Sequence, residues 1–248
     1  MVDIHAHILP GIDDGAQDIY DTLDMAQLAA DSGVKEIVAT PHCNIPGMYE
    51  NYFDEEYRRA FRMAERAIQE EGIPIRLLPG MEVFATYNLP ELLIEGKVMP
   101  LNQSRYVLME FAFDEDGQYA AELLERVSEV KAKPIIAHAE RYEFVQDNPQ
   151  IIYEWRKQGY LVQVNKSSFQ GSFGRYAERT AYALLEHGLI SVIASDAHSP
   201  ERRTTYMANV YEQLRLEYPE NKLKVLFEDN PRRICEDMPT IRFPLRPF

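Results

Sequence analysis

Short apolar runs alternate with stretches of helical spacing along the chain, and this alternation constrains the fold more than any other feature of the sequence. Seven such runs can be read: VDIHAH, EIVAT, RLLPGMEVF, YVLMEF, PIIAH, LVQVN and SVIAS. A first helix is expected over residues 18–32, where Ile19, Leu23 and Ala30 share one helical face and Gly33 follows as a stop. Runs that are apolar at successive positions suit parallel strands covered on both faces. The pattern therefore predicts an α/β fold with seven parallel strands, arranged as a sheet or a barrel.

The chain contains 248 residues, a length that one α/β barrel can fill. Its hydrophobic content of 46% excludes a disordered chain. No repeat, low-complexity tract or linker rich in Pro, Gly and Ser divides the sequence. We therefore expect a single domain over residues 1–248.

Charge and cysteine usage disfavour several classes of function. The formal net charge of −14 opposes nucleic-acid binding, which uses clustered Lys and Arg. No apolar run approaches the roughly 18 residues of a spanning helix, so direct membrane insertion is not expected. Cys43 and Cys235 form neither a disulfide framework nor a CxxC pair, and no export signal opens the chain. The expected location is the cytoplasm.

Two long segments are expected to be loops: residues 44–59, with the sequence NIPGMYENYFDEEYRR, and residues 166–176, with the sequence KSSFQGSFGRY. Their Tyr, Phe and Gly content suits a lid or a recognition surface. An ordinary packed loop explains the same composition equally well. His187, in the stretch LEHG, is interpreted as a structural residue at the end of a helix.

Every expected strand delivers a polar side chain to its end. In order along the chain, these are His5 with His7, His42, Glu82, Glu110, His138, Asn165, and Asp196 with His198. In a parallel barrel the carboxyl ends of all strands lie on one face, where active sites are built. We therefore expect these distant residues to converge on that face.

The histidines are concentrated at these ends, which hold five of the six. Because strand side chains alternate, His5 and His7 are expected on one side of the first strand, with Asp3, and the apolar residues between them on the other. Two neutral imidazoles on one side can ligate one metal ion. Asp196 and His198, in SDAH, repeat the same spacing and form a second candidate ligand pair.

Three further acids are candidates for metal ligands. Glu82 and Glu110 are embedded in the apolar stretches MEV and MEF, and a buried carboxylate needs a cation or hydrogen-bond partners. Asp14 lies in DDG, which is also good turn chemistry, so both a turn role and a ligand role remain open.

Five histidines and four acids are more donors than one ion needs, so a cluster of two or three ions is expected. His, Asp and Glu without cysteine form a ligand set suited to Mn²⁺, Fe²⁺ or Zn²⁺. Such a cluster activates water at neutral pH and stabilises the oxygens of a phosphoryl group during its transfer.

Several stretches, taken together and in order, resemble one known family. They are DIHAHILPGIDDGA, ATPHCN, GMEVF, LMEFAF, AHAERY, VQVNKSSF and ASDAHS. The set is similar to the polymerase and histidinol phosphatase (PHP) superfamily. More narrowly, it resembles the manganese-dependent protein-tyrosine phosphatases encoded in capsule and exopolysaccharide operons of Gram-positive bacteria. The resemblance runs from residue 1 to Ile234 and implies a distorted TIM-like (β/α)7 barrel with a metal site at the C-terminal face of the strands.

The resemblance also implies the ligands of a three-metal cluster, with Mn²⁺ as the expected ion and Fe or Zn as alternatives. By motif position, these ligands are His5, His7, Asp14, His42, Glu82, Glu110, His138, Asp196 and His198. Glu82 is expected to bridge two ions.

Arg141 and Arg203 are similar to the two arginines with which this family clamps phosphate, and a shift of one residue would exchange Arg203 for Arg202. Bidentate arginine matches phosphate geometry better than lysine does. Asp196 and a water at the metal site are alternative proton donors for the leaving group. Asn165 is either a hydrogen-bond partner of the ligands or an ordinary strand-end residue.

By resemblance, the substrate is phosphotyrosine on the tyrosine-rich tail of a membrane-associated bacterial tyrosine kinase that controls polysaccharide export. Neither Cys43 nor Cys235 is followed six residues later by Arg, so covalent cysteine catalysis is disfavoured.

Three other functions compete with this one. The first is a small-molecule phosphomonoesterase of the same superfamily, such as a histidinol phosphatase. The second is an amidohydrolase-like enzyme, which commonly uses a metal-bridging lysine that we do not find at any strand end. The third is a binding protein that retains a metal site without turnover.

Overall fold

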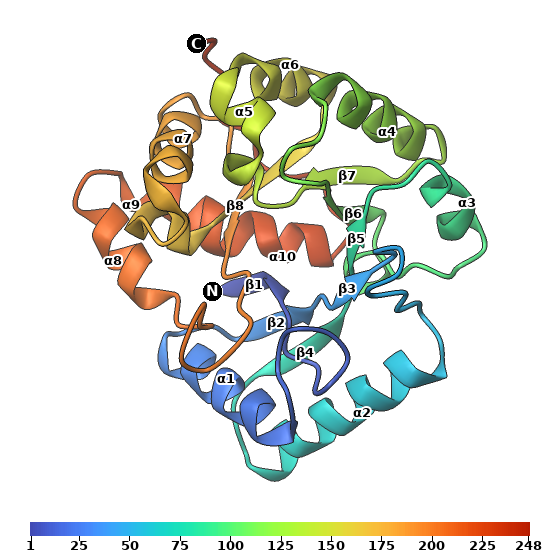
Figure 1. Ribbon diagram of the computed structural model, residues 1–248. Helices are drawn as coiled ribbons and strands as arrows, with labels where there is room; N and C mark the ends of the chain where they lie inside the picture. The colour runs from blue at the N-terminus through green and yellow to red at the C-terminus, as the bar shows by residue number, and fades with distance from the viewer.

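The strands form two curved parallel sheets in the computed structural model, which describes all residues 1–248 (Figure 1). The three-stranded sheet has the order β1-β2-β4, and the six-stranded sheet has the order β3-β5-β6-β7-β8-β9. The strands are β1 (Val2–Ala6), β2 (Glu36–Ala39), β3 (His42–Cys43), β4 (Arg76–Pro79), β5 (Glu82–Phe84), β6 (Tyr106–Glu110), β7 (Lys133–Ile136), β8 (Leu161–Asn165) and β9 (Val192–Ala194). A parallel bridge between Ala6 and Ala197 joins the two sheets beyond β9. The predicted α/β class and distorted TIM-like barrel are confirmed.

The predicted count of seven strands is wrong, because two of the runs each contain two strands. The run that begins with EIVAT breaks at Pro41, which has no N–H for a ladder bond, and His42 then starts β3. The run RLLPGMEVF breaks at Gly80, where an added Cβ would lie 2.6 Å from Val38 Cγ1. Both runs change sheets at the break, since β2 pairs with β4 and β3 pairs with β5. His42 and Glu82 therefore begin short strands rather than ending long ones.

Helices surround the sheets (Figure 1). They are α1 (Ile19–Asp31), α2 (Glu55–Glu70), α3 (Leu89–Ile94), α4 (Gly117–Glu129), α5 (Glu143–Asp147), α6 (Gln150–Gln158), α7 (Gly174–Glu186), α8 (Ala208–Arg215), α9 (Glu220–Lys224) and α10 (Asn230–Cys235), with a π-helical turn at Val225–Asp229. The predicted first helix is confirmed: the Asp18 side chain caps α1 by accepting from the backbone N–H groups of Tyr20 and Asp21. None of the helices combines the length and the apolar surface that crossing a membrane requires.

Both predicted long loops are shorter than expected. Asp54 caps α2, so the first loop ends before Glu55 instead of running to residue 59. The second segment forms a 3-10 helix over Lys166–Gln170, and α7 begins at Gly174. His187 lies directly after α7 and stacks on Phe248, in agreement with a structural role.

Two hydrophobic clusters hold the barrel together. The outer cluster fills the space between strands and helices, and the inner cluster contains side chains from the inward face of the strands together with Ile234 and Cys235 of α10. Ile4 belongs to the inner cluster and Ala6 to the outer one, and the pairing register of β1 shifts between Asp3 and Ala6. The predicted placement of His5 and His7 on one side of the strand is confirmed, because their buried Nε2 atoms lie 3.3 Å apart. The expectation that Ile4 and Ala6 share the other side was wrong, since they belong to different clusters.

Candidate metal centre

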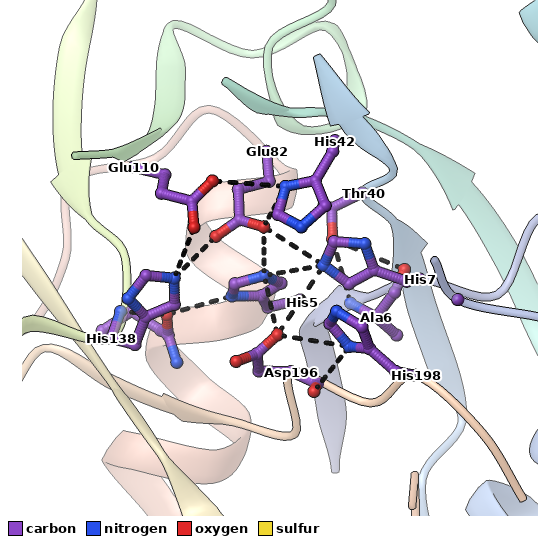
Figure 2. A network of polar contacts seen from close by, with 12 residues as sticks. His5, Ala6, His7, Thr40, His42, Glu82, Glu110, His138, Asp196 and His198 are labelled. Carbon is purple, nitrogen blue, oxygen red and sulfur yellow. Dashed lines mark hydrogen bonds and ion pairs between the residues drawn. The ribbon is translucent and has the colours of Figure 1, made fainter. Parts of the chain in front are cut away.

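The floor of the site is made by His5 and His7 together with Glu82 (Figure 2). The Nε2 atoms of the two histidines lie 3.3 Å apart. Glu82 Oε2 lies 3.2 Å from His5 Nε2 and 3.1 Å from His7 Nε2. All three side chains are buried, so an acidic oxygen and two imidazole nitrogens meet at one point away from bulk water.

Asp196 and His198 come from the segment after β9 and lie beside His5 and His7 (Figure 2). Asp196 Oδ1 lies 3.4 Å from His5 Nε2 and 3.6 Å from His198 Nδ1. Asp14 approaches from the loop after β1, and its Oδ1 lies 3.6 Å from the Nε2 atom of His198. Its side chain is 49% exposed, so Asp14 occupies the solvent edge of the site.

The opposite wall consists of His42, Glu110 and His138, which surround Glu82 (Figure 2). His42 Nδ1 lies 3.2 Å from Glu82 Oε2 and 3.2 Å from Glu110 Oε2. His138 Nε2 lies 2.9 Å from Glu82 Oε1 and 3.5 Å from Glu110 Oε1. The structure thus brings together all nine residues that the sequence put forward as ligands.

Within this assembly the donor atoms form three groups whose members lie within 4.8 Å of one another. The groups are His7, Asp14, His42 and His198; His5, His7, Glu82 and Asp196; and His42, Glu82 and Glu110. Glu82, His7 and His42 each belong to two of them, and Glu82 is the carboxylate among these three, with two oxygens that could bridge two ions. His138 is in none of the three, although it contacts Glu82.

The donors fit metal ions better than they fit one another. Donors that lie about 2.0–2.2 Å from one ion are roughly 3.0–3.6 Å apart, the range of the contacts above. Glu82 Oε2, Glu110 Oε2 and His42 Nδ1 are buried atoms without a hydrogen-bond partner. Buried polar atoms are rarely left unpaired, and these three belong to the three residues of one donor group.

Asp13 orients the ring of His7 and holds the backbone of His42, and the sequence analysis missed it. Its Oδ2 lies 2.7 Å from His7 Nδ1 and accepts the backbone N–H of His42 at 2.8 Å. A carboxylate at Nδ1 keeps that nitrogen protonated and leaves Nε2 free for a metal. Gly15 permits this turn, because a Cβ there would lie 2.1 Å from the His7 carbonyl oxygen. The adjacent acids in DDG were the available signal, but spacing alone could not say which one faces inward.

A buried amide chain orients the other side of the site. Gln163 Oε1 lies 3.1 Å from His5 Nδ1 and accepts the backbone N–H of His138 at 2.8 Å. Gln163 Nε2 donates to Asn165 Oδ1, and Asn165 Nδ2 donates to Asp196 Oδ2 at 2.6 Å. Asn165 is therefore a hydrogen-bond partner of a candidate ligand rather than an ordinary strand-end residue. Gln163 was missed, since a polar residue inside LVQVN can equally face outward.

Two arginines line the mouth of the site. Arg203 Nη2 lies 2.5 Å from Asp196 Oδ2, and Arg141 Nη1 lies 3.7 Å from the same oxygen. The Arg203 Nε atom is buried without a hydrogen-bond partner. Arg202 is exposed to solvent, so Arg203 is the member of this pair that faces the site.

Three residues of the site have a strained backbone. His138, Asp196 and Arg203 have positive φ angles of 30°, 50° and 52°, a region that residues other than glycine rarely occupy. Such strain persists where the surrounding structure holds it, and it clusters at functional sites.

The charges of the donor groups depend strongly on their neighbours. Burial opposes protonation of His138, but the hydrogen-bonded carboxylates of Glu110 and Glu82 outweigh it and raise its pKa to about 10. Burial and the nearby His7 lower the pKa of His198 to about 2. Burial would raise the pKa of Asp196, but the charges of His5 and Arg203 hold it far below its usual range. Without metal, protons on imidazoles thus compensate the buried carboxylates.

Metal binding is therefore expected to release protons. A raised His138 pKa means that an ion must displace a proton at neutral pH, so affinity should fall as the pH is lowered. His198 is already neutral and should release none. Calorimetric titration of Mn²⁺ into chelator-stripped protein, in two buffers of different ionisation enthalpy, measures this release. The expectation would be contradicted if the heat of binding did not depend on the buffer and if the affinity for Mn²⁺ stayed the same between about pH 6 and pH 8.

Neither the two cysteines nor Lys166 belongs to the donor groups of the site. Cys43 and Cys235 are buried free thiols whose pKa values burial raises to about 12, so neither is poised as a nucleophile. The expectation that no lysine stands at a strand end was wrong, because Lys166 directly follows β8. Burial lowers the pKa of Lys166 against the opposing charge of Asp3, and Asp3 belongs to none of the donor groups.

Comparison with known proteins gives consistent matches over the full chain. The family described as "Capsular polysaccharide synthesis, CpsB/CapC" matches residues 1–236. The protein is 33% identical over 247 residues to the tyrosine-protein phosphatase YwqE of Bacillus subtilis, covering 100% of this chain and 96% of YwqE. It is 31% identical to the tyrosine-protein phosphatase CpsB of Streptococcus pneumoniae, covering 96% of this chain and 99% of CpsB.

Solved structures agree with these matches. A chain from the crystal structures of YwqE and CpsB, described as unique metal-dependent tyrosine phosphatases, superposes with a TM-score of 0.93 at 32% identity and covers 100% of this chain and 99% of its own length. The phosphotriesterase from Mycobacterium tuberculosis superposes with a TM-score of 0.63 at 12% identity, over 97% of this chain and 95% of its own. The second likeness concerns the barrel fold alone.

Proposed function

Because this chain belongs to the CpsB/CapC family of capsular polysaccharide synthesis, we propose that it is a metal-dependent protein-tyrosine phosphatase whose active site is the cluster around Glu82. The observation that carries the proposal is the meeting of nine His, Asp and Glu side chains beside two arginines. We further propose Mn²⁺, the ion that the family resemblance implies, in a cluster of two or three, and a donor set of imidazole and carboxylate without thiolate is compatible with it.

When bound, the ions supply Lewis acidity that activates water and draws charge from the phosphoryl oxygens. The nine proposed ligands hold them: His5, His7, Asp14, His42, Glu82, Glu110, His138, Asp196 and His198. Asp13 and Gln163 fix the ring orientations of His7 and His5, so that the Nε2 atoms point into the site.

Arg141 and Arg203 bind the non-bridging oxygens of the phosphate. Their guanidinium groups present planar donor pairs, and the unpaired Nε–H of Arg203 is available to an oxygen. Asp196 anchors both arginines through Oδ2 while Oδ1 faces the histidines. Because its pKa is held low, Asp196 stays ionised and acts as ligand and anchor rather than as proton donor. A phenol leaving group, with an unperturbed pKa near 10, needs little help from an acid.

The proposed substrate is a phosphotyrosine protein. We propose that it is the phosphorylated tail of a membrane-associated bacterial tyrosine kinase of the capsule system. The name of the family supports a place in capsular polysaccharide synthesis, and the names of its relatives support phosphotyrosine. We propose that the enzyme acts in the cytoplasm, where its free thiols stay reduced.

A substrate comparison with Mn²⁺ tests the proposed activity. We expect kcat/KM for a phosphotyrosine peptide to exceed that for histidinol phosphate, and that for a matched phosphoserine peptide, by at least about tenfold, since only the first offers both a phenol leaving group and a flanking chain. Faster hydrolysis of histidinol phosphate would favour a small-molecule phosphomonoesterase instead. Absence of turnover on all three substrates would favour a binding protein.

A further inference from the structure

Three contiguous cavities lead from the metal centre across the surface. The metal pocket has a volume of about 140 Å³ and is lined by charged groups and imidazoles, apart from Phe113. Phe113 and Arg141 also line a second space of about 180 Å³, the junction cavity, together with Gln146, Phe173 and Ala177. Gln146 in turn lines a third cavity of about 610 Å³, which lies between α5 and α7. Shared residues thus connect each space to the next.

The lining of the metal pocket suits a phosphate and its cations rather than an aromatic ring, because nine of its ten residues carry a charge or an imidazole. The tyrosyl ring is therefore expected to lie toward the open side of the pocket. Phe113, the hydrophobic residue in the lining, marks the side that favours an aromatic ring.

The junction cavity is built around a stack of two phenyl rings and one guanidinium group. The guanidinium carbon of Arg141 lies 4.3 Å from the ring centres of both Phe113 and Phe173. Arg203 lies 5.5 Å from the Phe173 ring. Cation–π contacts of this kind hold a guanidinium in place. The stack therefore fixes one phosphate-binding arginine and presents apolar ring edges at the exit.

Beyond the junction, the α5–α7 cavity offers groups without internal partners. Arg179, Glu143 and Asp147 are exposed and take part in no ion pair. Tyr176 and Phe248 add exposed aromatic surface. The volume lies in the range of ligand-binding clefts, and Tyr and Arg are the residues that contribute most at protein interfaces. Helices α5 and α7 lie side by side in Figure 1, so the groove between them is a fixed feature of the fold.

We propose that the junction cavity and the α5–α7 cavity form the binding groove for the polypeptide that flanks the phosphotyrosine. This proposal rests on the proposed phosphatase function and adds the path of the substrate chain. The phosphotyrosyl ring lies at the exit of the metal pocket, against the Phe113–Arg141–Phe173 stack. The neighbouring residues of the substrate peptide lie between α5 and α7. Tyr176 and Arg179 are then specificity-determining residues, which contact the peptide and not the phosphate.

Two variants test the groove without touching the metal site. We expect Tyr176→Ala and Arg179→Ala each to lower kcat/KM for a phosphotyrosine peptide of about ten residues by at least about fivefold, mainly through a higher KM. The kinetic constants for p-nitrophenyl phosphate, which has no peptide, should not change. Both side chains are exposed, so folding should be unaffected.

Arg66→Ala provides the matched control, because Arg66 is an exposed arginine on α2, which Figure 1 draws far from α5 and α7. This variant should match the unsubstituted enzyme on both substrates. The groove is refuted if both groove variants cleave the peptide at the original kcat/KM, or if they lose activity equally on p-nitrophenyl phosphate. If the unsubstituted enzyme cleaves p-nitrophenyl phosphate but no phosphotyrosine peptide, the proposed function fails instead.

Discussion

Replacing Glu82 with glutamine is expected to reduce kcat by more than about a hundredfold, because loss of a mere outer-shell partner of a metal ligand already costs about 10–100-fold. Glu82 contacts His5, His7, His42 and His138, and it belongs to two of the three donor groups. Glutamine keeps the shape of the side chain but removes the charge that attracts the ions. The variant should also bind Mn²⁺ more weakly, as measured by calorimetry on chelator-stripped protein.

Thermal unfolding separates metal loss from misfolding in this experiment. A ligand that binds only the folded state raises stability, so chelator should lower the melting temperature of the unsubstituted protein and have little effect on Glu82→Gln. Glu91→Gln, at an exposed position on α3, is the matched control and should behave like the unsubstituted protein. Full activity of Glu82→Gln with unchanged Mn²⁺ affinity would show that the cluster is not the catalytic centre.

Replacing Arg203 with alanine is expected to lower kcat/KM by about 10²–10³-fold, the cost of losing one preorganised donor to a developing charge. Arg203 lies at the mouth of the metal pocket, paired with Asp196 at 2.5 Å. Arg203→Lys should recover only part of the loss, because an ammonium group keeps the charge without the planar donor pair. Steady-state kinetics on p-nitrophenyl phosphate and on a phosphotyrosine peptide measure both variants.

The neighbouring arginine supplies the control for this prediction. Arg202 is exposed and does not line the pocket, so Arg202→Ala should retain the original kcat/KM on both substrates. If Arg202→Ala lost more kcat/KM than Arg203→Ala, Arg202 rather than Arg203 would be the phosphate-binding arginine. Complete recovery by Arg203→Lys would mean that charge alone matters and that bidentate geometry does not.

The two segments that differ most from expectation show where sequence reasoning was limited. Pro41 and Gly80 each interrupt an apolar run, yet a break in one run does not reveal that both runs leave one sheet and enter the other together. That exchange depends on pairing between strands far apart in the chain. The helix cap at Asp54 was readable in principle, but the aromatic residues before it resemble loop composition.

Within the site, residue chemistry was more predictable than residue orientation. His-x-His, SDAH and the two buried glutamates identified the candidate donors, because imidazoles and carboxylates at strand ends have few other uses. No sequence pattern identified Asp13 and Gln163. Their roles depend on the direction in which the turn after β1 and the strand β8 present these side chains.

The amino-acid sequence by itself determined the α/β class and the set of candidate ligands, because both follow from local periodicity and side-chain chemistry. Only the tertiary structure decided which donors share an ion-sized space, which acid orients His7 and which arginine faces Asp196. These outcomes depend on distances between residues up to 191 positions apart, such as His5 and Asp196, and no local pattern in a chain encodes such distances.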